Sequence, residues 1–420
     1  MSVTRLSPAE ASAHVLAGVA PLGEETVALP EALGRVLAQD IESPVSLPPW
    51  DNASMDGFAA HASDVRGASA SRPVRLRVVE TIAAGTAATR ALEAGTAMRI
   101  MTGAPVPEGA DTVIRVEDTT TTGEIVEIRD DRDVASNVRV AGEDVRVGAV
   151  VMRAGTTLGA AQIGVLSSVG CARLAVHRRP RVAILATGDE LVPIEQFADA
   201  LAGRRIVSSN SYSLEAAVRA AGGDPVSLGI GADDPDALAR LLRGAEGCDV
   251  IVTSGGVSVG DFDFTRTVVD RLGGALSLWR VRMRPGAPLA FGRLFGVPWL
   301  GLPGNPVSAL VTFELFGRPL LRTLLGSSRP HRRTVPVVLD EDVLLRAPLT
   351  HFLRGVLTDG ADAQLHARLT GAQSSGMLTS MSAADALLVV PAEPQRVPAG
   401  SVLRALPMDG EFGGSTSFPG

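Results

Sequence analysis

The sequence predicts an α/β fold with additional β domains: a doubly wound α/β domain, an inserted all-β domain and a small C-terminal β-barrel. Three observations lead to this prediction. The chain has 420 residues and a mass of 43.4 kDa, too long for one core because domains usually contain about 100 to 200 residues. Strand-like and helix-like runs alternate over residues 181–326. Short β-type runs with Gly, Pro and Thr turns fill residues 74–128 and return after residue 334.

The N-terminal segment predicts where the first helix begins. Ser7-Pro8-Ala9-Glu10 combines an N-cap, a proline at the first helical position and an acid in the first turn, so we expect a helix to about Ala17. A second short helix is expected over residues 31–36. The proline-rich residues 43–49 must be extended and indicate a crossing into the β domain, which is then an insertion. The predicted units are residues 1–44 with 141–178, residues 45–140, residues 179–327, residues 328–409 and a flexible tail at 410–420.

Composition excludes several classes of protein. The formal net charge is −7, and no stretch clusters arginine with aromatic residues as a nucleic-acid groove requires. No apolar run approaches the about 18 residues of a membrane span. Cys171 and Cys248 have neither metal-site spacing nor a disulfide pattern. These features predict a cytoplasmic protein that binds neither nucleic acid nor membrane.

A glycine-rich segment, SGGVSVGDFD at residues 254–263, directly follows a predicted strand and precedes a predicted helix. Backbone amides and the helix dipole favour phosphate at such a turn, and open α/β sheets bind ligands beyond the carboxyl ends of their strands. A tight structural turn is the alternative interpretation. Two hydroxyls and two acids in the segment favour binding. The candidate phosphate-binding residues are Ser254, Gly255, Gly256, Ser258 and Gly260.

Acidic residues follow other strands of the same predicted sheet. Glu190 follows one strand, Asp233 follows another, and Asp263 closes the glycine-rich segment. If the sheet is parallel, these side chains meet at one edge. Taken alone, such positions are equally typical of turns and helix caps. Carboxylates beside a phosphate would repel it unless a hard cation bridges them, so the set predicts Mg²⁺ held by all three and phosphoryl chemistry.

Arginines and a rigid turn indicate a second, anion-binding feature. Arg280 and Arg284 lie at the end of a predicted strand, where arginine can clamp an oxyanion in bidentate fashion. Alternating arginines are also typical of the solvated face of an edge strand. In LPGNPVS, Pro303 and Pro306 fix a turn and leave the hydroxyl of Ser308 on the following helix, which suits a preorganised anion site.

Seven motifs occur in order: PPWDNASMDGFA, RIMTGAPVPEGADTVIRVED, AGEDVRVG, ATGDEL, TSGGVSVGDFDFT, MRPG and LPGNPVSA. Together they resemble the molybdopterin molybdenumtransferase family, which includes MoeA and the E domain of gephyrin. The likeness extends from about Leu6 to Leu406. It implies an elongated homodimer of four-part subunits with a MogA-like α/β domain. It also implies that the discontinuous first unit contributes to dimerisation and that the partner's β domain closes each active cleft.

The resemblance also implies roles for individual residues. In such enzymes the phosphoanhydride of adenylylated molybdopterin (molybdopterin-AMP) is hydrolysed when molybdate arrives, so that molybdenum stays on the dithiolene and AMP leaves. The carboxylates would hold Mg²⁺ on the phosphates and orient water, and other molybdenum cofactor biosynthesis proteins are expected partners. By motif, the catalytic positions are Asp56, Thr102, Asp144, Glu190, Asp233 and Asp263, and Pro303 and Pro306 match as well. Molybdate would be received by Arg284, Ser308, Arg354 and Ser375.

Some residues depart from the family pattern. The family usually has lysine where this chain has Arg280 and Arg284, and the chain contains no lysine at all. A guanidinium is a planar fork and an ammonium a point charge, so the replacement conserves charge without being equivalent. Ala287 removes a positive charge that the family often has; either molybdate binds more weakly here or another arginine compensates. Ser209 replaces an aspartate of the family, which would alter nucleotide or pterin contacts.

Three alternative functions remain open at this point. One is a molybdopterin adenylyltransferase like the stand-alone α/β homologue, although that step needs only the central domain. Another is a tungstate-inserting variant, because tungstate and molybdate have nearly the same size and charge. The third is a non-catalytic scaffold, which would not need the acids at Asp56, Glu190, Asp233 and Asp263.

Overall fold

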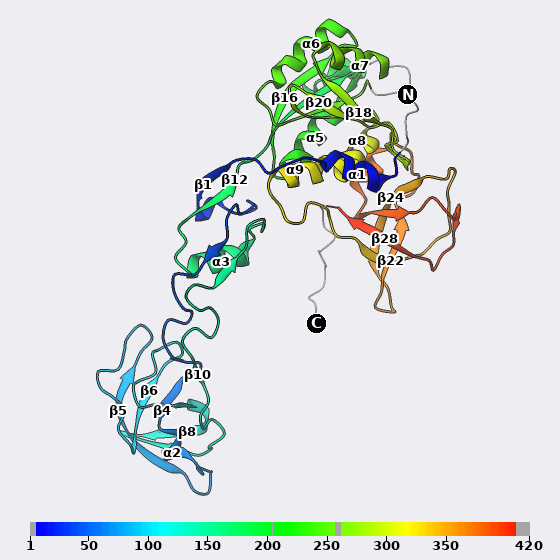
Figure 1. Ribbon diagram of the computed structural model, residues 1–420. Helices are drawn as coiled ribbons and strands as arrows, with labels where there is room; N and C mark the ends of the chain where they lie inside the picture. The colour runs from blue at the N-terminus through cyan, green and yellow to red at the C-terminus, as the bar shows by residue number, and fades with distance from the viewer. Residues whose placement is uncertain (1–5, 204, 257–261, 409–420) are drawn as a thin grey trace.

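The computed structural model describes residues 6–203, 205–256 and 262–408, and for residues 262–266 and 279 it describes the backbone alone. The described chain is elongated (Figure 1), with an α/β body and a barrel at one end, a β-rich unit at the other and a narrow neck between them. None of the described helices is long and apolar enough to cross a membrane.

The neck consists of two stretches of chain that run out and back. β1 (Glu24–Ala28) pairs antiparallel with β12 (Arg173–His177), and β2 (Ile41–Glu42) pairs antiparallel with β11 (Val150–Met152). The short helix η1 (Leu29–Glu31) and α3 (Ala160–Ser168) pack against these strands. The helix predicted over residues 31–36 is wrong. Gly34 adopts a φ of +76°, and the chain beyond it bridges to Thr157 and Val176 instead of continuing a helix.

The β-rich unit is built around one mixed sheet with apolar cores on both faces. The strand order is β7-β4-β6-β5-β9-β8, and all four residues of β4 are buried because the strand is covered on both sides. A separate pair joins β3 (Asn52–Ala53) to β10 (Val138–Arg139), where the chain enters and leaves. The inserted all-β fold is confirmed, while its exact boundaries stay a prediction. The other elements are β4 (Gly57–Ala60), α2 (Ala62–Val65), β5 (Val74–Ile82), β6 (Thr96–Ile100), β7 (Thr112–Arg115), η2 (Val116–Asp118), β8 (Thr119–Thr122) and β9 (Ile125–Ile128).

The α/β body contains a six-stranded sheet in the order β16-β13-β17-β21-β20-β18. The first four strands are parallel, and β20 is antiparallel to both its neighbours, so the expected parallel sheet is correct for the part that carries the predicted site. The strands are β13 (Arg181–Thr187), β16 (Asp224–Gly231), β17 (Val250–Ser254), β18 (Ala275–Trp279), β20 (Ala290–Leu294) and β21 (Val297–Leu302).

Helices cover both faces of this sheet, as a doubly wound fold requires. One core contains residues of α1, α5, α8 and α9, and the other contains residues of α6 and α7. α1 begins at the predicted N-cap, Ser7, where the structure forms a capping box in which Ser7 N donates to Glu10 Oε2 at 2.8 Å. The helices are α1 (Pro8–Leu16), η3 (Ile194–Gln196), α4 (Phe197–Ala202), α5 (Ser209–Ala220), α6 (Pro235–Leu242), η4 (Arg243–Ala245), α7 (Phe262–Arg271), α8 (Pro306–Thr312), the π-helical turn η5 (Phe313–Gly317) and α9 (Arg318–Leu324).

The C-terminal region forms the predicted barrel. Its strands close in the ring β24-β25-β22-β28-β26, because β24 also pairs with β26. The strands are β22 (Val335–Leu339), β24 (Thr350–Asp359), β25 (Leu365–Leu369), β26 (Ala386–Val390) and β28 (Val402–Pro407). Smaller elements are α10 (Leu378–Ser382), the pair β23 (Val343–Leu344) with β27 (Arg396–Val397), and in the body the pair β14 (Leu191–Val192) with β15 (Ile206–Val207).

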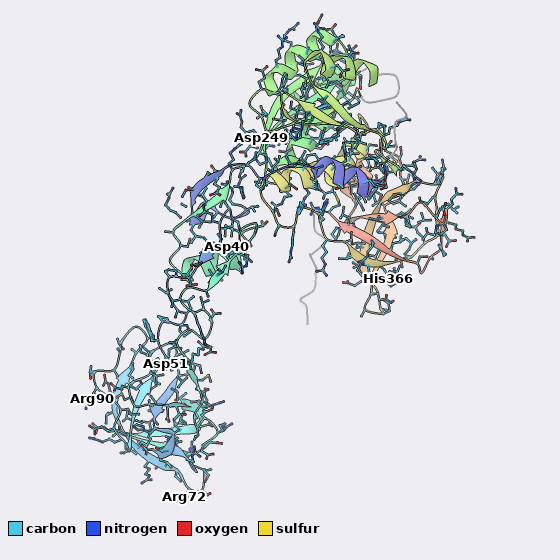
Figure 2. All side chains as sticks on the ribbon, viewed as in Figure 1. Asp40, Asp51, Arg72, Arg90, Asp249 and His366 are labelled. Atoms are coloured by element: carbon cyan, nitrogen blue, oxygen red, sulfur yellow. The ribbon has the colours of Figure 1, made fainter. Side chains whose placement is uncertain are left out.

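Two connections hold these units together. The run LSLWRVRM, predicted as one strand, divides at Arg280, whose φ is +75°, and β19 (Met283–Arg284) leaves the body to pair with β24 of the barrel. At the neck, Arg178 Nη1 donates to Asp249 Oδ2 at 2.8 Å, and Arg181 N donates to the same oxygen at 2.8 Å. Figure 2 labels Asp249 where the neck meets the body.

Candidate functional site

Two cavities adjoin where the α/β body meets the barrel. The first, here called the strand-end cavity, has a volume of about 590 Å³ and includes Glu190, Asp233, Ser254, Gly255, Gly256, Pro303 and Pro306 in its lining. The second, here called the arginine cavity, has a volume of about 750 Å³ and includes Arg284, Pro303, Ser308, Arg354 and Ser375. Pro288, Pro303 and Asn305 line both cavities. The residues predicted for phosphate and for oxyanion are therefore neighbours.

Glycine and asparagine shape the strand-end cavity. Gly255 follows β17 with a φ of +93°, and a Cβ placed there would lie 2.4 Å from the Thr187 carbonyl oxygen, so only glycine allows β13 and this loop to approach so closely. Ser254 is 2% exposed. Asn210 Nδ2 donates to the Gly304 carbonyl oxygen at 2.8 Å and ties the LPGNP turn to α5. Ser208 is the N-cap of α5, so Asn210 lies within the helix, and its buried Oδ1 has no hydrogen-bond partner in the part of the chain that the structure describes.

Two carboxylates lie at the edge of this cavity. Gly188 lets the Glu190 side chain fold back, since a Cβ at Gly188 would lie 2.6 Å from Glu190 Oε2. Within the described chain the Glu190 carboxylate forms no hydrogen bond or ion pair. The Asp233 backbone amide donates to Asp189 Oδ1 at 3.1 Å. Ser258, Gly260 and the side chain of Asp263 lie outside the described residues.

Carboxylate and hydroxyl oxygens are the donors that Mg²⁺ prefers, so the residues present fit the predicted ion. Among the described residues no group of three His, Cys, Asp or Glu side chains is close enough to hold a metal by itself. Mg²⁺ is commonly bound through one or two carboxylates together with substrate phosphates and water. Glu190 and Asp233 suit that mode of binding.

Arg354 is the most deeply placed cation of the arginine cavity, with no exposed surface. Its Nε donates to Ser380 Oγ at 3.1 Å and its Nη2 to the Ser374 carbonyl oxygen at 3.0 Å, whereas no described residue is a partner of its buried Nη1. Burial lowers the pKa of Arg354, yet a guanidinium stays charged at neutral pH. Because no described carboxylate pairs with it, Arg354 offers both a charge and a free donor to an anion.

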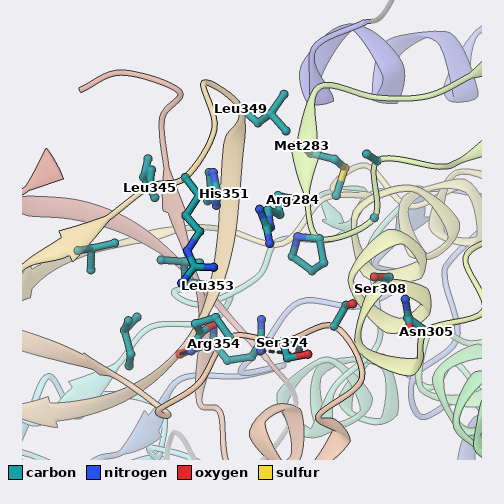
Figure 3. Close-up of a pocket in the computed structure, with 18 of the residues that line it drawn as sticks. Met283, Arg284, Asn305, Ser308, Leu345, Leu349, His351, Leu353, Arg354 and Ser374 are labelled. Carbon is teal, nitrogen blue, oxygen red and sulfur yellow. Dashed lines mark hydrogen bonds between the residues drawn. The ribbon is translucent and has the colours of Figure 1, made fainter. Parts of the chain in front are cut away.

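Arg284 and Ser308 reach the same cavity from the α/β body (Figure 3). Ser308 on α8 is 5% exposed, and no described residue hydrogen-bonds its hydroxyl. The Val307 amide donates to the Ser375 carbonyl oxygen at 3.1 Å and so connects the start of α8 to the barrel loop. Arg280, by contrast, lines neither cavity and lies half-buried in the break between β18 and β19.

Sequence reasoning missed two basic residues on this wall, Arg346 and His351. His351 is the register partner of Arg284, is 4% exposed, and has Nε2 3.2 Å from the Ala347 carbonyl oxygen. Burial, with a smaller contribution from the Arg284 charge, holds the pKa of His351 below its usual value. Neither residue belongs to a recognisable motif, so only their place in the fold identifies them.

Of the remaining predicted residues, Asp56 and Thr102 lie in the distant β-rich unit, and Asp144 lies between β10 and β11, where the chain returns to the neck. Asp56 Oδ1 accepts hydrogen bonds from Thr102 N and Thr102 Oγ1, each at 2.7 Å, and these bonds lower the pKa of Asp56. Asp144 lines a separate cavity of about 470 Å³ with Asn52 and Arg139. The structure thus pairs Asp56 with Thr102 but brings none of the three into the cavities of the same chain.

Comparison with known proteins decides the family. The model described as the MoeA N-terminal region (domain I and II) matches residues 6–170, the probable molybdopterin binding domain matches residues 183–323, and the MoeA C-terminal region (domain IV) matches residues 336–408. A molybdopterin molybdenumtransferase of Nostoc sp. is 38% identical over 87% of this chain and 85% of its own length. The chain belongs to the molybdopterin molybdenumtransferase family.

Other members of the family are similar along the same length. Molybdopterin molybdenumtransferase 2 of Mycobacterium tuberculosis is 38% identical over 90% of this chain and 94% of its own length. A crystal structure of the molybdopterin biosynthesis moeA protein from Pyrococcus horikoshii superposes with a TM-score of 0.83 at 28% identity, covering 96% of this chain and all of that one. The α/β fold with additional β domains is therefore the family's own architecture.

Proposed function

We propose that this chain is a molybdopterin molybdenumtransferase that inserts molybdate into adenylylated molybdopterin and releases AMP. One observation carries the proposal: the strand-end cavity and the arginine cavity share Pro288, Pro303 and Asn305. A substrate whose phosphates occupy the first cavity can therefore present its dithiolene to an oxyanion held in the second. The curated relatives carry the name of this activity along nearly the whole chain.

In the strand-end cavity, backbone groups of Gly255 and Gly256 border the substrate's phosphates. Glu190 and Asp233 would hold Mg²⁺, which would supply positive charge to offset the charge of the phosphoanhydride. Glu190 has no competing partner in the described chain and can orient the attacking water. We include Asp263, Ser258 and Gly260 in this site from their place in the sequence.

In the arginine cavity, Arg284, Arg354 and Ser308 would receive molybdate. Two guanidinium groups offset the two negative charges of the oxyanion, and planar forks can donate two parallel hydrogen bonds to its oxygens. Arg354 is already fixed by Ser380 and Ser374 and loses little side-chain freedom on binding. Preorganised donors of this kind stabilise developing charge without rearrangement.

The protein would act as a homodimer in the cytoplasm. The two cavities of the same chain's α/β body are lined by none of Asp56, Thr102 and Asp144. This supports a β-rich unit that completes the cleft of a partner subunit. The two cysteines are free, as a reducing compartment allows.

The decisive experiment measures AMP after the protein is mixed with adenylylated molybdopterin and Mg²⁺, with molybdate added separately. We expect release of AMP to depend on molybdate, and Glu190→Gln to slow it by about 100-fold or more because an oriented acid–base group is lost. Glu195→Gln, an exposed change on η3 outside the cavity, is the matched control. AMP release without any oxyanion dependence would refute the proposal, and formation of adenylylated molybdopterin from ATP would favour the adenylyltransferase.

A further inference from the structure

The arginine cavity carries more positive charge than its predicted residues supply. Arg346 lines it together with Arg284 and Arg354, and these three arginines come from separate segments of the chain. The cavity has one acidic residue, Asp342. Its Oδ2 accepts from Arg396 Nη2 at 2.7 Å and its Oδ1 from the Ala399 amide at 2.8 Å, so this carboxylate is already engaged. The lining of the arginine cavity therefore carries a positive charge.

Arg346 has no partner within the described chain. Its guanidinium forms no hydrogen bond and no ion pair with a described residue, and the side chain is exposed. An exposed arginine is usually a solvated surface charge. Here, however, the preceding residue fixes its backbone: Leu345 is 7% exposed in the barrel core, and its amide donates to the Gln395 carbonyl oxygen at 2.7 Å.

A second observation points to a ligand in this cavity. Arg354 Nη1 is a fully buried charged donor without a hydrogen-bond partner among the described residues, and such a group is costly unless a ligand or water satisfies it. Ala287 lines the same cavity and contributes no charge. The cavity thus combines an unsatisfied fixed donor, an uncharged position and an unpaired arginine on the barrel side.

We propose that Arg346 binds the tetrahedral oxyanion in the arginine cavity and supplies the positive charge that Ala287 does not. The proposal rests on molybdate as the substrate of this site and adds a specificity residue to it. Arg346 contacts the oxyanion from the barrel, and Arg284 contacts it from β19, the strand that connects the α/β body to the barrel. A long, exposed side chain can close over the anion after entry, whereas Arg354 is fixed before it arrives.

Binding of molybdate alone, measured by isothermal titration calorimetry at low ionic strength, tests this inference without requiring turnover. We expect Arg346→Ala to weaken binding about 10-fold, the effect of losing one charge-assisted hydrogen bond, and Arg346→Lys to weaken it less. Arg404→Ala, an exposed arginine of β28 outside the cavity, should bind like the wild type. Because Arg346 has no structural partner, its variants should melt at the wild-type temperature.

A second, independent test restores the positive charge at another position of the same cavity. Ala287→Lys in the Arg346→Ala protein should recover most of the lost affinity, because the two positions line the same cavity. Equal binding by wild type and Arg346→Ala would overturn this inference alone and leave the proposed function standing. A wild-type protein that binds no molybdate would overturn the oxyanion site and this inference together.

Discussion

Individual residues of the arginine cavity set how the protein responds to pH. The pKa of His351 lies below its usual value because burial disfavours the charged ring, so His351 stays neutral in the folded protein when it would be protonated in the unfolded chain. Stability from this residue is present above the unfolded pKa of about 6.5 and is lost as pH falls toward the folded pKa. We expect His351→Gln to reduce the loss of melting temperature between pH 7.5 and pH 5.5.

His366 provides a contrast in the same barrel. Asp340 and then Asp362 raise the pKa of His366, so its contribution to stability is present below the unfolded pKa and is lost as pH rises through the folded pKa. His366→Gln should therefore destabilise the protein more at pH 5.5 than at pH 7.5. If both variants shift the pH profile in the same direction, the assignment for His351 is wrong.

Motifs that fix a backbone identify candidate residues that the structure places around one cavity. The LPGNPVS turn identified Pro303 and Ser308, and both line the arginine cavity. The sequence did not identify Arg346 and His351 as site residues, because they reach the cavity from a barrel segment whose pattern is that of ordinary strands and turns. The contact of Asn210 with Gly304 spans 94 positions, so no local pattern in the sequence encodes it.

At the scale of elements, the close approach of β13 to the loop after β17 depends on Gly255. Gly255 has a left-handed φ of +93°, which strains any other residue. A Cβ at this position would also lie 2.4 Å from the Thr187 carbonyl oxygen. We expect Gly255→Ala to lower the free energy of unfolding by more than the roughly 1 kcal/mol that a left-handed φ costs a non-glycine residue, and to weaken substrate binding. Urea unfolding and binding of adenylylated molybdopterin would measure both effects.

Gly247→Ala is the matched control for this change. Gly247 precedes β17 with a similar φ of +81°, but a Cβ there would meet nothing within 4 Å. The control should show the cost of backbone strain alone and leave substrate binding unchanged. Equal destabilisation by the two substitutions would show that the contact with Thr187 does not matter.

Strands with a strong apolar pattern were predictable, whereas the antiparallel edge of the sheet was not. β17 is buried along its whole length, and it begins with three successive apolar residues, Val250, Ile251 and Val252. The hairpin between β20 and β21 has positive φ at Phe295 (52°) and Gly296 (82°), a turn whose usual sequence is Asn-Gly. Phenylalanine at the first position conceals the turn, and so β20 was not expected.

At the scale of the whole molecule, local sequence patterns identified the units but could not place the β-rich unit relative to a cleft. Within one chain a neck separates it from the α/β body (Figure 1), which contains most of the lining of the strand-end cavity. The catalytic role predicted for Asp56, which is paired with Thr102, therefore requires a partner subunit that brings its cleft to this unit. The proposed homodimer makes this arrangement testable, because each cleft would combine residues of two chains.

Heterodimers purified through two different tags distinguish a cleft built from two subunits from a cleft built within one chain. If each cleft takes Asp56 from one chain and Glu190 from the other, pairing an Asp56→Asn chain with a Glu190→Gln chain leaves one cleft intact and restores about half of the wild-type AMP release. Each variant as a homodimer should be nearly inactive, since every cleft then lacks one group.

The reciprocal heterodimer, wild type paired with a chain that carries both substitutions, contains the same number of altered residues. If clefts assemble across subunits, both clefts of this heterodimer are defective. One combines the wild-type Glu190 with the altered Asp56→Asn unit, and the other combines the wild-type Asp56 with the altered Glu190→Gln cleft. Assembly within one chain predicts the opposite, with this heterodimer half active and the first one inactive. The two pairings thus reverse their activities according to which chain supplies Asp56, and an active reciprocal heterodimer would show that the β-rich unit serves its own chain.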